Sequence, residues 1–447
     1  MHGSISLEDE LSVEDRLFGL SLFWKEVSYN FAFFHQVPDL DFDKVYLEYL
    51  TKAIKPQSTF QYYKLLMEFC ALLKDGHTNI YLPVELEAQY FDWPCIELEE
   101  NGGLAIVISV AEEFAHLIPL GSVLTKIDGI EITNYLRENV VPYIAASSQR
   151  TQLDSAISVA LSGRHNSTVS IDFIAPNGSH GQQSLKRIGR GFNGKYKSLK
   201  LKPVSNCTLN YELLGDDVAY ISLNSFDDPC IVGEFESLIP ELSSKSALVI
   251  DLRFNGGGDT QVGAEILSYL TDCELIGPKW HTREHVSAYR AWGAVLPEYQ
   301  SYASDNAWVE GSSDSIVPKE KGSLHLPLVI LIGRNTASAA EDFLIYTNSM
   351  TNVTTIGERT RGSTGQPIFG ELPGGGRFRV CAKRDTYPNG EDFVGLGIEP
   401  DIYLSRSHAD ILSAADTVKE SAYQMLQEII SKSEPTSQTG VTSNRNN

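Results

Sequence analysis

A single serine between two alanines is the first residue in this chain whose position suggests catalysis. Ser338 lies in "GRNTASAAEDF", which follows the apolar run "LPLVILIG" and opens a predicted helix that Asn335 or Thr336 can cap. The first turn of a helix favours negative charge, so a serine there could act as a nucleophile with a stabilised oxyanion intermediate. Ser338 and Glu341 also fit a capping box, an ordinary start of a helix. Taken alone, the segment favours the capping box.

Three consecutive glycines form a second candidate site. Gly256 to Gly258, in "DLRFNGGGD", end another apolar stretch and lead into another predicted helix. Glycine lets the backbone approach a ligand closely, and free amides at such a turn can hold an anion or a developing oxyanion. Taken alone, the segment is better explained by a tight turn. Because open α/β sheets place ligands at the carboxyl ends of their strands, both turns are predicted to face one crevice, which favours the catalytic interpretation.

Alternating patterns predict the elements that must position these residues. Residues 7–85 have apolar residues at helical spacing, and residues 93–190 have short strands with one helix. Residues 187–203 are expected to be a linker. From 205 to 425, apolar strands alternate with helices, which indicates an α/β core with a largely parallel sheet. Residues 430–447 are nearly devoid of apolar side chains and are predicted to be a disordered tail.

The charge of the chain limits its partners. The 447 residues include 58 acidic and 36 basic side chains, which gives a formal net charge of −22. Nucleic acids and anionic lipids need a basic surface, and no local cluster of Lys or Arg supplies one. The composition therefore argues against nucleic acid as a partner and favours cations, neutral peptides or small molecules.

Cysteine usage and motifs give no sign of a bound metal. None of the six cysteines belongs to a C-x-x-C pair, which is typical of free thiols in a reducing compartment. The sequence also lacks H-E-x-x-H and EF-hand patterns, so neither a metal nor another cofactor is expected. The cysteines are Cys70, Cys95, Cys207, Cys230, Cys273 and Cys381.

The N-terminal stretch "MHGSISLEDELSVEDRL" has no basic segment followed by an apolar one, so it does not resemble a secretory signal. No apolar run approaches the roughly 18 residues of a membrane span. As written, the sequence predicts a cytoplasmic protein without a transmembrane segment. A leader removed earlier would leave the same sequence in a periplasmic or secreted protein.

Four segments in combination resemble the carboxyl-terminal processing (tail-specific) serine peptidases. They are "DLRFNGGGDTQVGAEIL", "LIGRNTASAAEDF", "TTIGERTRGSTGQ" and "VGLGIEPDI". The superfamily includes the tricorn protease core and interphotoreceptor retinoid-binding protein modules. The resemblance spans roughly residues 10 to 425 and implies a helical cap, a PDZ-like module and a ClpP/crotonase-like core. It also implies peptide or protein substrates and leaves an oligomer possible.

The resemblance assigns roles to residues of the core. Ser338 would be the nucleophile, and the backbone amides of Gly257 and Ala339 would form the oxyanion hole. The PDZ-like module, which "GSVLTKIDGIEI" (121–132) resembles, would bind substrate C-termini.

One departure concerns the general base. The best-known members carry lysine after G-x-x-T-x-G, whereas here Ser363 follows Gly362. The tricorn-like branch instead uses a histidine from the region before its PDZ-like module, which corresponds to His77. Histidine titrates near neutrality and has two distinct nitrogens, as a base requires. A plain turn histidine is the alternative interpretation, and His285 is the fallback base.

An acid that orients the histidine would come from "PNGEDFVGLGIEPD", with Glu391 and Asp392 as candidates in an ambiguous register. A hydrated turn explains both equally well. Tricorn's histidine follows a serine in its relay, but here that position is Gly76. The resemblance therefore leaves Thr78 or Ser363 to complete the relay.

Three functions remain open from the sequence. The first is a serine endopeptidase that works through an acyl-enzyme on Ser338. The second is an inactive protein that binds an apolar ligand, as retinoid-binding relatives do. The third is a scaffold that binds C-terminal peptides through its PDZ-like module.

Overall fold

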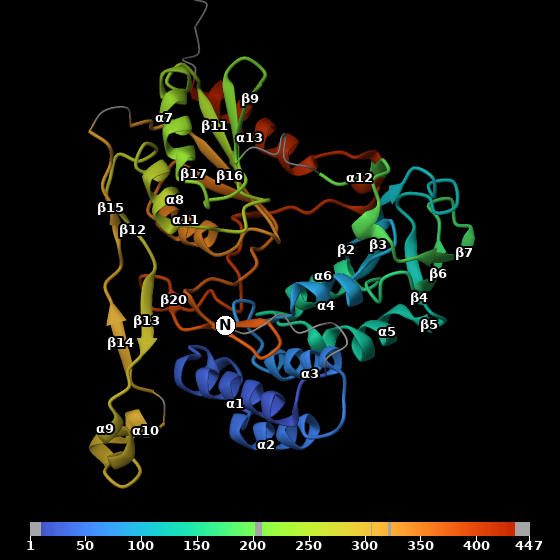
Figure 1. Ribbon diagram of the computed structural model, residues 1–447. Helices are drawn as coiled ribbons and strands as arrows, with labels where there is room; N and C mark the ends of the chain where they lie inside the picture. Colours follow the sequence, from blue (N-terminus) through green and yellow to red (C-terminus); the bar gives the residue numbers. More distant parts are fainter. Residues whose placement is uncertain (1–9, 202–207, 305, 321–322, 434–447) are drawn as a thin grey trace, which may run out of the picture.

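Three N-terminal helices lie together at one end of the molecule (Figure 1). The computed structural model describes residues 10–201, 208–304, 306–320 and 323–433. Ser12, Asp41 and Ser58 cap the three helices, each by accepting a hydrogen bond from a backbone amide three residues later. The elements of this region are α1 Val13–Asn30, α2 Phe42–Ala53, α3 Thr59–Ala71 and the short strand β1 Asn79–Tyr81.

The helices are joined to the C-terminal part of the chain rather than set apart from it. Strand β1 pairs antiparallel with β19 (Arg377–Cys381), which also pairs with β18 (Pro367–Glu371). The ring of Phe23 contacts the rings of Phe69 and Phe378 edge to face, and all three are buried. This packing fixes the turn between α3 and β1, which carries His77.

A second unit is a sheet of short antiparallel strands with its own hydrophobic core. The predicted helix within residues 93–190 corresponds to α6 (Gln149–Val159). The predicted linker is wrong in part, because β8 (Tyr196–Ser198) pairs with β3 and extends this sheet. The other elements are α4 Val84–Tyr90, β2 Ile96–Asn101, β3 Leu104–Ala111, β4 Val123–Ile127, β5 Ile130–Glu131, α5 Ile132–Asn139, β6 Thr168–Ile174 and β7 His180–Lys186.

The third unit is a six-stranded sheet between helices, in the order β21-β17-β16-β11-β10-β9. All its strands are parallel except the edge strand β9, so the predicted parallel α/β core is confirmed. The strands are β9 Leu209–Leu214, β10 Val218–Leu223, β11 Ala247–Asp251, β16 Leu328–Ile332, β17 Val353–Gly357 and β21 Ile402–Tyr403.

Helices cover both faces of this sheet (Figure 1). Leu248 and Ile250 belong to the large core cluster beneath α7, α8 and α11, whereas Val249 belongs to a smaller cluster beneath α13. This alternation is the two-residue period of a strand buried on both sides. The helices are α7 Cys230–Leu242, α8 Thr260–Leu267, α11 Ala339–Thr347 and α13 Thr417–Ser433.

An arm extends from the core, as Figure 1 shows on the left. Its strand β13 pairs with β14 and, at its base, with β20. The elements of this region are β12 Leu275–Ile276, β13 Lys279–Arg283, α9 Ser287–Trp292, α10 Gln300–Ala303, β14 Trp308–Gly311, β15 Ser315–Ile316 and β20 Arg384–Thr386.

The C-terminal end differs from the predicted tail. α13 continues to Ser433, so the first four residues of the range 430–447 are helical. Residues 434–447 lie outside the described part of the chain. Before α13, the short helix α12 (His408–Ser413) packs Ile411 against Ile106 and Ile108 of β3. The predicted domain ranges 7–85, 93–190 and 205–425 stay predictions.

Candidate active site

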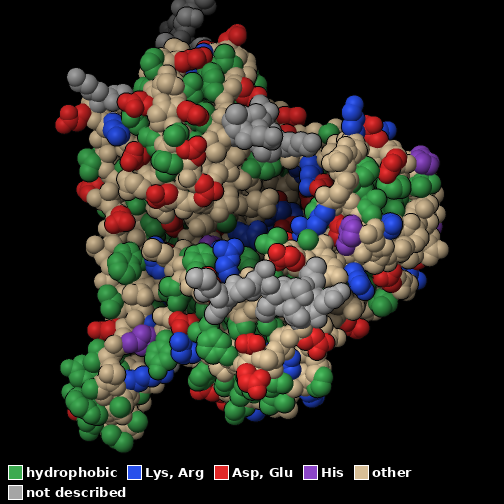
Figure 2. Space-filling model, viewed as in Figure 1, with side chains coloured by type: hydrophobic (Ala, Val, Ile, Leu, Met, Phe, Trp, Pro, Cys, Tyr) green, Lys and Arg blue, Asp and Glu red, His purple; other side chains and the backbone are tan. Residues whose placement is uncertain are grey.

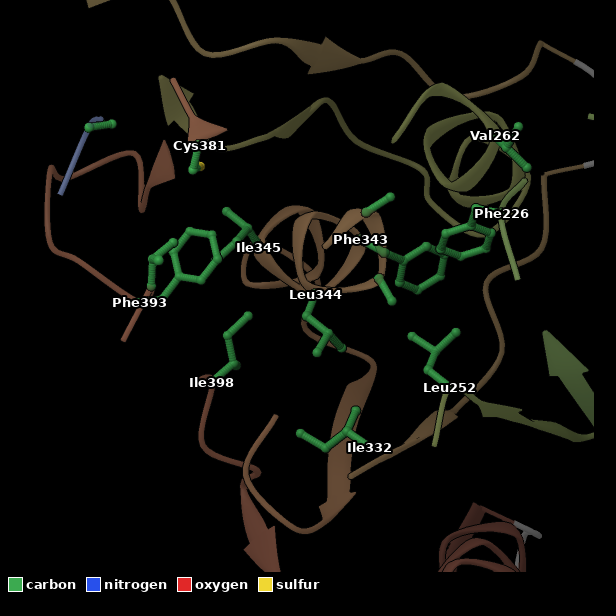
Figure 3. Packing of buried hydrophobic residues seen from close by; sticks show 14 of the residues in the cluster. Phe226, Leu252, Val262, Ile332, Phe343, Leu344, Ile345, Cys381, Phe393 and Ile398 are labelled. Carbon is green, nitrogen blue, oxygen red and sulfur yellow. The ribbon is translucent and has the colours of Figure 1, made fainter. Parts of the chain in front are cut away.

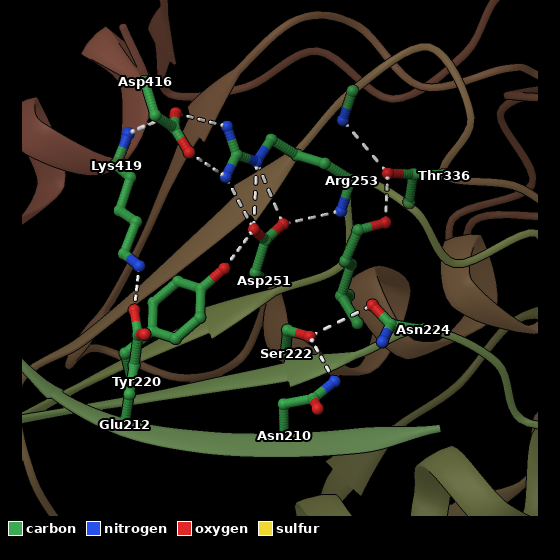
Figure 4. Close-up of polar contacts among 12 residues, drawn as sticks. Asn210, Glu212, Tyr220, Ser222, Asn224, Asp251, Arg253, Thr336, Asp416 and Lys419 are labelled. Atoms are coloured by element: carbon green, nitrogen blue, oxygen red, sulfur yellow. Dashed lines mark hydrogen bonds and ion pairs between the residues drawn. The ribbon is translucent and has the colours of Figure 1, made fainter. Parts of the chain in front are cut away.

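Ser338 lies where the chain leaves β16 and enters α11. Its backbone has φ 55° and ψ −128°, a conformation that residues other than glycine rarely adopt. Its side chain makes no capping bond, so the capping-box interpretation is wrong. Thr336, one of the two residues expected to cap the helix, does not cap it. Its hydroxyl accepts from the Gly333 amide and donates to the Leu252 carbonyl (Figure 4). Strained backbone of this kind concentrates at functional sites.

Helix α11 is held rigidly behind Ser338. All nine of its residues are buried. In Figure 3, Phe343 points toward Phe226 and Ile345 toward Phe393, on opposite sides of the helix axis. The rings of Phe226 and Phe343 are stacked at 5.8 Å. The start of the helix is therefore fixed by its packing, without a side-chain cap.

The glycine turn meets Ser338, as the sequence predicts. A Cβ atom on Gly257 would lie 2.5 Å from Ser338 Cβ and 3.0 Å from Ser338 Oγ, and Gly257 has φ +107°. Only glycine fits this position. The Gly257 amide donates to Asn255 Oδ1 at 2.9 Å, so it would have to share or exchange this acceptor to hold an oxyanion. The Ala339 amide has no hydrogen-bond partner among the described residues.

Ser363 links the nucleophile to the histidine. Its Oγ lies 2.6 Å from His77 Nδ1, and its carbonyl accepts from the Ser338 amide at 2.9 Å. The side chain is 1% exposed. A Cβ on Gly76 would lie only 2.6 Å from Ser363 Oγ, so the glycine before His77 makes room for this hydroxyl.

Glu341 holds the loop that carries Ser363. Its carboxylate is buried and accepts hydrogen bonds from the Ser363 amide at 2.9 Å, the Gly362 amide at 2.7 Å and the Thr360 hydroxyl. Burial raises the pKa of Glu341 to about 7 against these bonds. The sequence pointed to Glu341 only as a capping residue. Two adjacent carboxyl groups, Glu341 and Asp342, within the otherwise mostly apolar segment "AAEDFLIYT" are the sequence signal that was missed.

His77 is neutral in this environment. Burial, followed by the nearby charges of Arg379 and Arg361, lowers its pKa to about 3. Because Ser363 contacts Nδ1, the ring leaves Nε2 for another partner. No hydrogen bond joins Nε2 to Ser338 Oγ in the described part of the chain. Catalytic hydrogen bonds are often long before a substrate binds.

The two predicted orienting acids lie elsewhere. Asp392 accepts two hydrogen bonds from Arg384, at 2.9 and 2.8 Å, and lies 3.6 Å from His35. Glu391 is exposed and accepts from Asn389. Within the described ranges neither contacts His77, whose Nδ1 meets a serine in place of an acid.

His285, the alternative base, and Thr78, the other candidate for the relay, both make contacts away from the His77 ring. His285 contacts the Tyr29 carbonyl and packs its ring against Tyr29, at the base of the arm. Thr78 donates to the buried Asp75 at 2.6 Å and accepts from the Cys381 amide. Thr78 therefore stabilises the turn around His77 without touching its ring.

The described residues contain no group of three or more His, Cys, Asp or Glu side chains arranged to hold a metal ion. The expected free thiols are confirmed for the five described cysteines, which are Cys70, Cys95, Cys230, Cys273 and Cys381. Cys207 lies outside the described residues.

The model of peptidase family S41 matches residues 217–404, which include Gly257, Ser338 and Ser363. The carboxyl-terminal-processing protease of Synechocystis sp. is 24% identical over 372 residues, which cover 81% of this chain and 76% of that protein. The carboxyl-terminal-processing protease of Picosynechococcus sp. is 25% identical over 360 residues, which cover 79% of this chain and 75% of that protein. Residues 217–404, a little under half of the chain, therefore match peptidase family S41.

The family match and the two relatives together make the protein a serine-type peptidase. Solved structures agree in fold. Mature CPAF superposes with a TM-score of 0.72 at 15% identity, over 95% of this chain and 99% of that one. The photosystem II D1 C-terminal processing protease gives 0.50 at 19% identity, over 87% and 93%. At these identities, the structures show a shared mixed α/β fold and no more.

Among the described residues, no helix has the length and apolar character that crossing a membrane requires. The predicted cytoplasmic location stays a prediction.

Proposed function

We propose that this peptidase hydrolyses peptide bonds through an acyl-enzyme on Ser338, with His77 as general base. The observation that carries the proposal is the 2.6 Å contact between His77 Nδ1 and Ser363 Oγ, which orients the ring. With the Nδ1 proton donated to Ser363, Nε2 is the basic nitrogen. This is the tautomer that a serine nucleophile needs.

The proposed reaction has two halves. His77 Nε2 takes the proton from Ser338 Oγ as that oxygen attacks the scissile carbonyl, and the Gly257 and Ala339 amides hold the oxyanion. His77 then gives the proton to the leaving amine, and the acyl-enzyme forms. In the second half, His77 activates a water molecule that attacks the acyl-enzyme, and the proton returned by His77 releases Ser338. In this scheme Ser363 takes the orienting role that the sequence assigned to Glu391 or Asp392.

We further propose that the core is ClpP/crotonase-like and that the unit built from β2 to β8 is a PDZ-like module that binds substrate C-termini. The two relatives from Synechocystis sp. and Picosynechococcus sp. are both named carboxyl-terminal-processing protease, which supports this class of substrate. The antiparallel sheet, with α5 and α6 packed on it, supports the module.

The nucleophile and base can be tested together. Wild type, Ser338→Ala and His77→Ala are incubated with a fluorogenic peptide library and with a fluorophosphonate probe. We expect Ser338→Ala to lose hydrolysis and labelling, and His77→Ala to slow both by at least about 10³-fold, because triad members act as a unit. Equal hydrolysis by wild type and Ser338→Ala would contradict the proposal and favour a protein that only binds peptides or apolar ligands.

A further inference from the structure

Asn255 lies just before the glycine turn and bonds three separate parts of the site. The residue is fully buried. Its Nδ2 donates to the Leu223 carbonyl at the end of β10 at 3.0 Å, and its Oδ1 accepts from the Gly257 amide at 2.9 Å. Its backbone carbonyl accepts from the amide of Ala337, the residue before Ser338, at 3.1 Å. Asn255 therefore connects β10, the glycine turn and the turn that carries the proposed nucleophile.

The peptide group between Gly256 and Gly257 has glycine on both sides, so it turns over more easily than other peptide groups. The Gly257 carbonyl, on the far side of that residue, accepts from the Phe226 amide at 2.8 Å and is fixed. On the near side, the Asn255 side chain is the only acceptor of the Gly257 amide among the described residues. If this peptide group turned over, the Gly256 carbonyl would point where the Gly257 N–H points now. An acceptor would then stand where a donor is needed, and it would repel a developing oxyanion.

The Gly257 amide can keep its bond to Asn255 and still hold an oxyanion. One N–H group often serves two acceptors in a three-centre hydrogen bond. Hydrogen bonds to a charged oxygen are roughly twice as strong as those to a neutral one, so the oxyanion is the preferred acceptor as its charge develops. A Cβ atom on Gly257 would lie 3.0 Å from Ser338 Oγ, so the amide is close enough to the reacting atoms to be shared in this way.

We propose that Asn255 is a positioning residue of the hydrolysis. Its Oδ1 holds the peptide group between Gly256 and Gly257 in the orientation that presents the Gly257 amide to the oxyanion. The inference rests on the proposed function, in which Gly257 and Ala339 hold that oxyanion. Donors that are already oriented before the reaction supply a large part of the rate in enzymes of this kind. Asn255 does not touch the reacting atoms and acts only through Gly257.

Asp259, at the other end of the same turn, offers a matched control. Its side chain is exposed, accepts from the Gln261 amide at 2.9 Å and caps α8. Within the described part of the chain this side chain makes no other hydrogen bond. Asp259→Ala therefore removes a side-chain bond from the turn and leaves the orientation of the Gly257 amide unchanged.

The probe of the oxyanion hole has to be neutral before it reacts. In Figure 2, basic side chains gather in the hollow between the N-terminal helices and the α/β core on the face drawn, and such a surface attracts anions in general. A peptide aldehyde is neutral. Ser338 Oγ adds to its carbonyl carbon, the Ser338 proton passes to His77 Nε2, and the carbonyl oxygen becomes the oxyanion. The affinity of the aldehyde therefore reports on the oxyanion donors, and the affinity of an uncleaved peptide does not.

Three measurements on Asn255→Ala and Asp259→Ala test the role. We expect Asn255→Ala to lower kcat by about 10- to 100-fold, because loss of an oxyanion donor costs about 10²- to 10³-fold and the turn keeps the right orientation part of the time. The inhibition constant of the aldehyde should rise by a similar factor. The affinity of the uncleaved peptide, measured by calorimetry on Ser338→Ala with and without Asn255→Ala, should change by less than about 2-fold. Asp259→Ala should leave all three quantities close to wild type.

Other patterns overturn the role of Asn255. A general structural role would weaken binding of the aldehyde and of the uncleaved peptide equally. Tighter binding of the uncleaved peptide to the Asn255→Ala protein would show that Asn255 competes with the substrate for the Gly257 amide. Unchanged kcat and aldehyde affinity would overturn this inference alone. A wild type that neither hydrolyses peptides nor binds the aldehyde would overturn the proposed function together with it.

A measurement on wild type covers the case in which Asn255→Ala does not fold. In protein with isotopically labelled glycine, the NMR signal of the Gly257 amide proton should move downfield when the aldehyde binds, because its acceptor becomes charged. The uncleaved peptide bound to Ser338→Ala should leave this signal nearly in place. A Gly257 signal that does not move in the formed aldehyde complex would overturn the positioning role and leave Ser338 as the nucleophile.

Discussion

At the scale of single residues, Ser363 connects the parts of the site. Its hydroxyl contacts the base, its carbonyl accepts from the Ser338 amide, and its amide donates to Glu341. In the best-known relatives that the sequence resembles, this position is the lysine base itself. In the mechanism that we propose, Ser363 instead positions His77 as the base.

Exchanging Gly76 and Ser363 tests this positioning role. Ser363→Gly should lower kcat by about 10- to 100-fold with little change in KM, because the His77 ring loses one orienting hydrogen bond. Gly76→Ser alone should also impair the enzyme, since its Cβ would lie 2.6 Å from Ser363 Oγ. The double variant brings a hydroxyl to nearly the same place and should recover much of the lost kcat. Effects that simply multiply in the double variant would contradict the role.

At the scale of elements, the start of α11 combines backbone strain with burial. The nine buried residues of the helix hold Ser338 at φ 55°, where only glycine would be relaxed. The same helix carries Glu341, which fixes the opposite loop. A single short helix therefore positions both the proposed nucleophile and, through Glu341, the loop of Ser363.

The strain at Ser338 predicts a difference between two inactive variants. Ser338→Gly relieves the left-handed conformation, whereas Ser338→Ala keeps it. Because such strain costs roughly 1–3 kcal/mol and glycine returns about 0.5–1 kcal/mol through the unfolded state, Ser338→Gly should be about 1 kcal/mol more stable. Urea unfolding of both variants measures this. A less stable glycine variant would show that the backbone at Ser338 is not strained.

Glu341 predicts a pH dependence of stability. Its pKa is raised from 4.5 to about 7 in the folded protein, so the folded state holds this proton more tightly than the unfolded state. Its contribution is complete below about pH 4.5 and is lost as the pH rises through about 7. Relative to Glu341→Gln, which does not titrate, wild type should lose up to about 3 kcal/mol of unfolding free energy between pH 4.5 and 8. A constant difference in urea unfolding across this range would argue against a raised pKa.

At the scale of the whole molecule, the N-terminal helices and the α/β core share one hydrophobic cluster, whereas the β2–β8 unit has its own. His77 comes from the helical region, and Ser338 and Ser363 come from the core. The site therefore depends on one shared core. The β2–β8 unit supports it from outside, because Ser147 accepts from the Gly76 amide at 2.9 Å and Arg150 donates to the Thr360 carbonyl at 2.6 Å.

Two phenylalanine truncations test this organisation. Phe23→Ala, in the shared cluster, and Phe173→Ala, in the β2–β8 unit, each remove a buried ring and should cost about 3–5 kcal/mol locally. By hydrogen exchange, Phe23→Ala should loosen α1–α3 and strands β10, β11 and β16 together. Phe173→Ala should loosen β2–β8 and leave the core protected. Increased exchange in all units with either variant would mean that the molecule has a single cooperative core.

The sequence by itself determined the buried strands and helices of the core and the glycine turn that lies next to Ser338. Apolar stretches predicted the buried strands, and apolar residues at helical spacing predicted α8 and α11. The glycine turn was correctly expected to lie next to Ser338. These features depend on short stretches of chain, in which side-chain spacing and backbone preference act directly. The arm and strand β8 were not recognised, because their strands are short and their pairing partners are distant.

Only the tertiary structure decided which residues complete the site. His77 and Ser363 are 286 positions apart, and their contact depends on the pairing of β1 with β19 and on the anchoring of the Ser363 loop by Glu341. Glu391 and Asp392 fit the resemblance, but Asp392 is paired with Arg384 and Glu391 is exposed. Long-range hydrogen bonds are set by how whole elements pack, and the spacing of residues along the chain does not specify them.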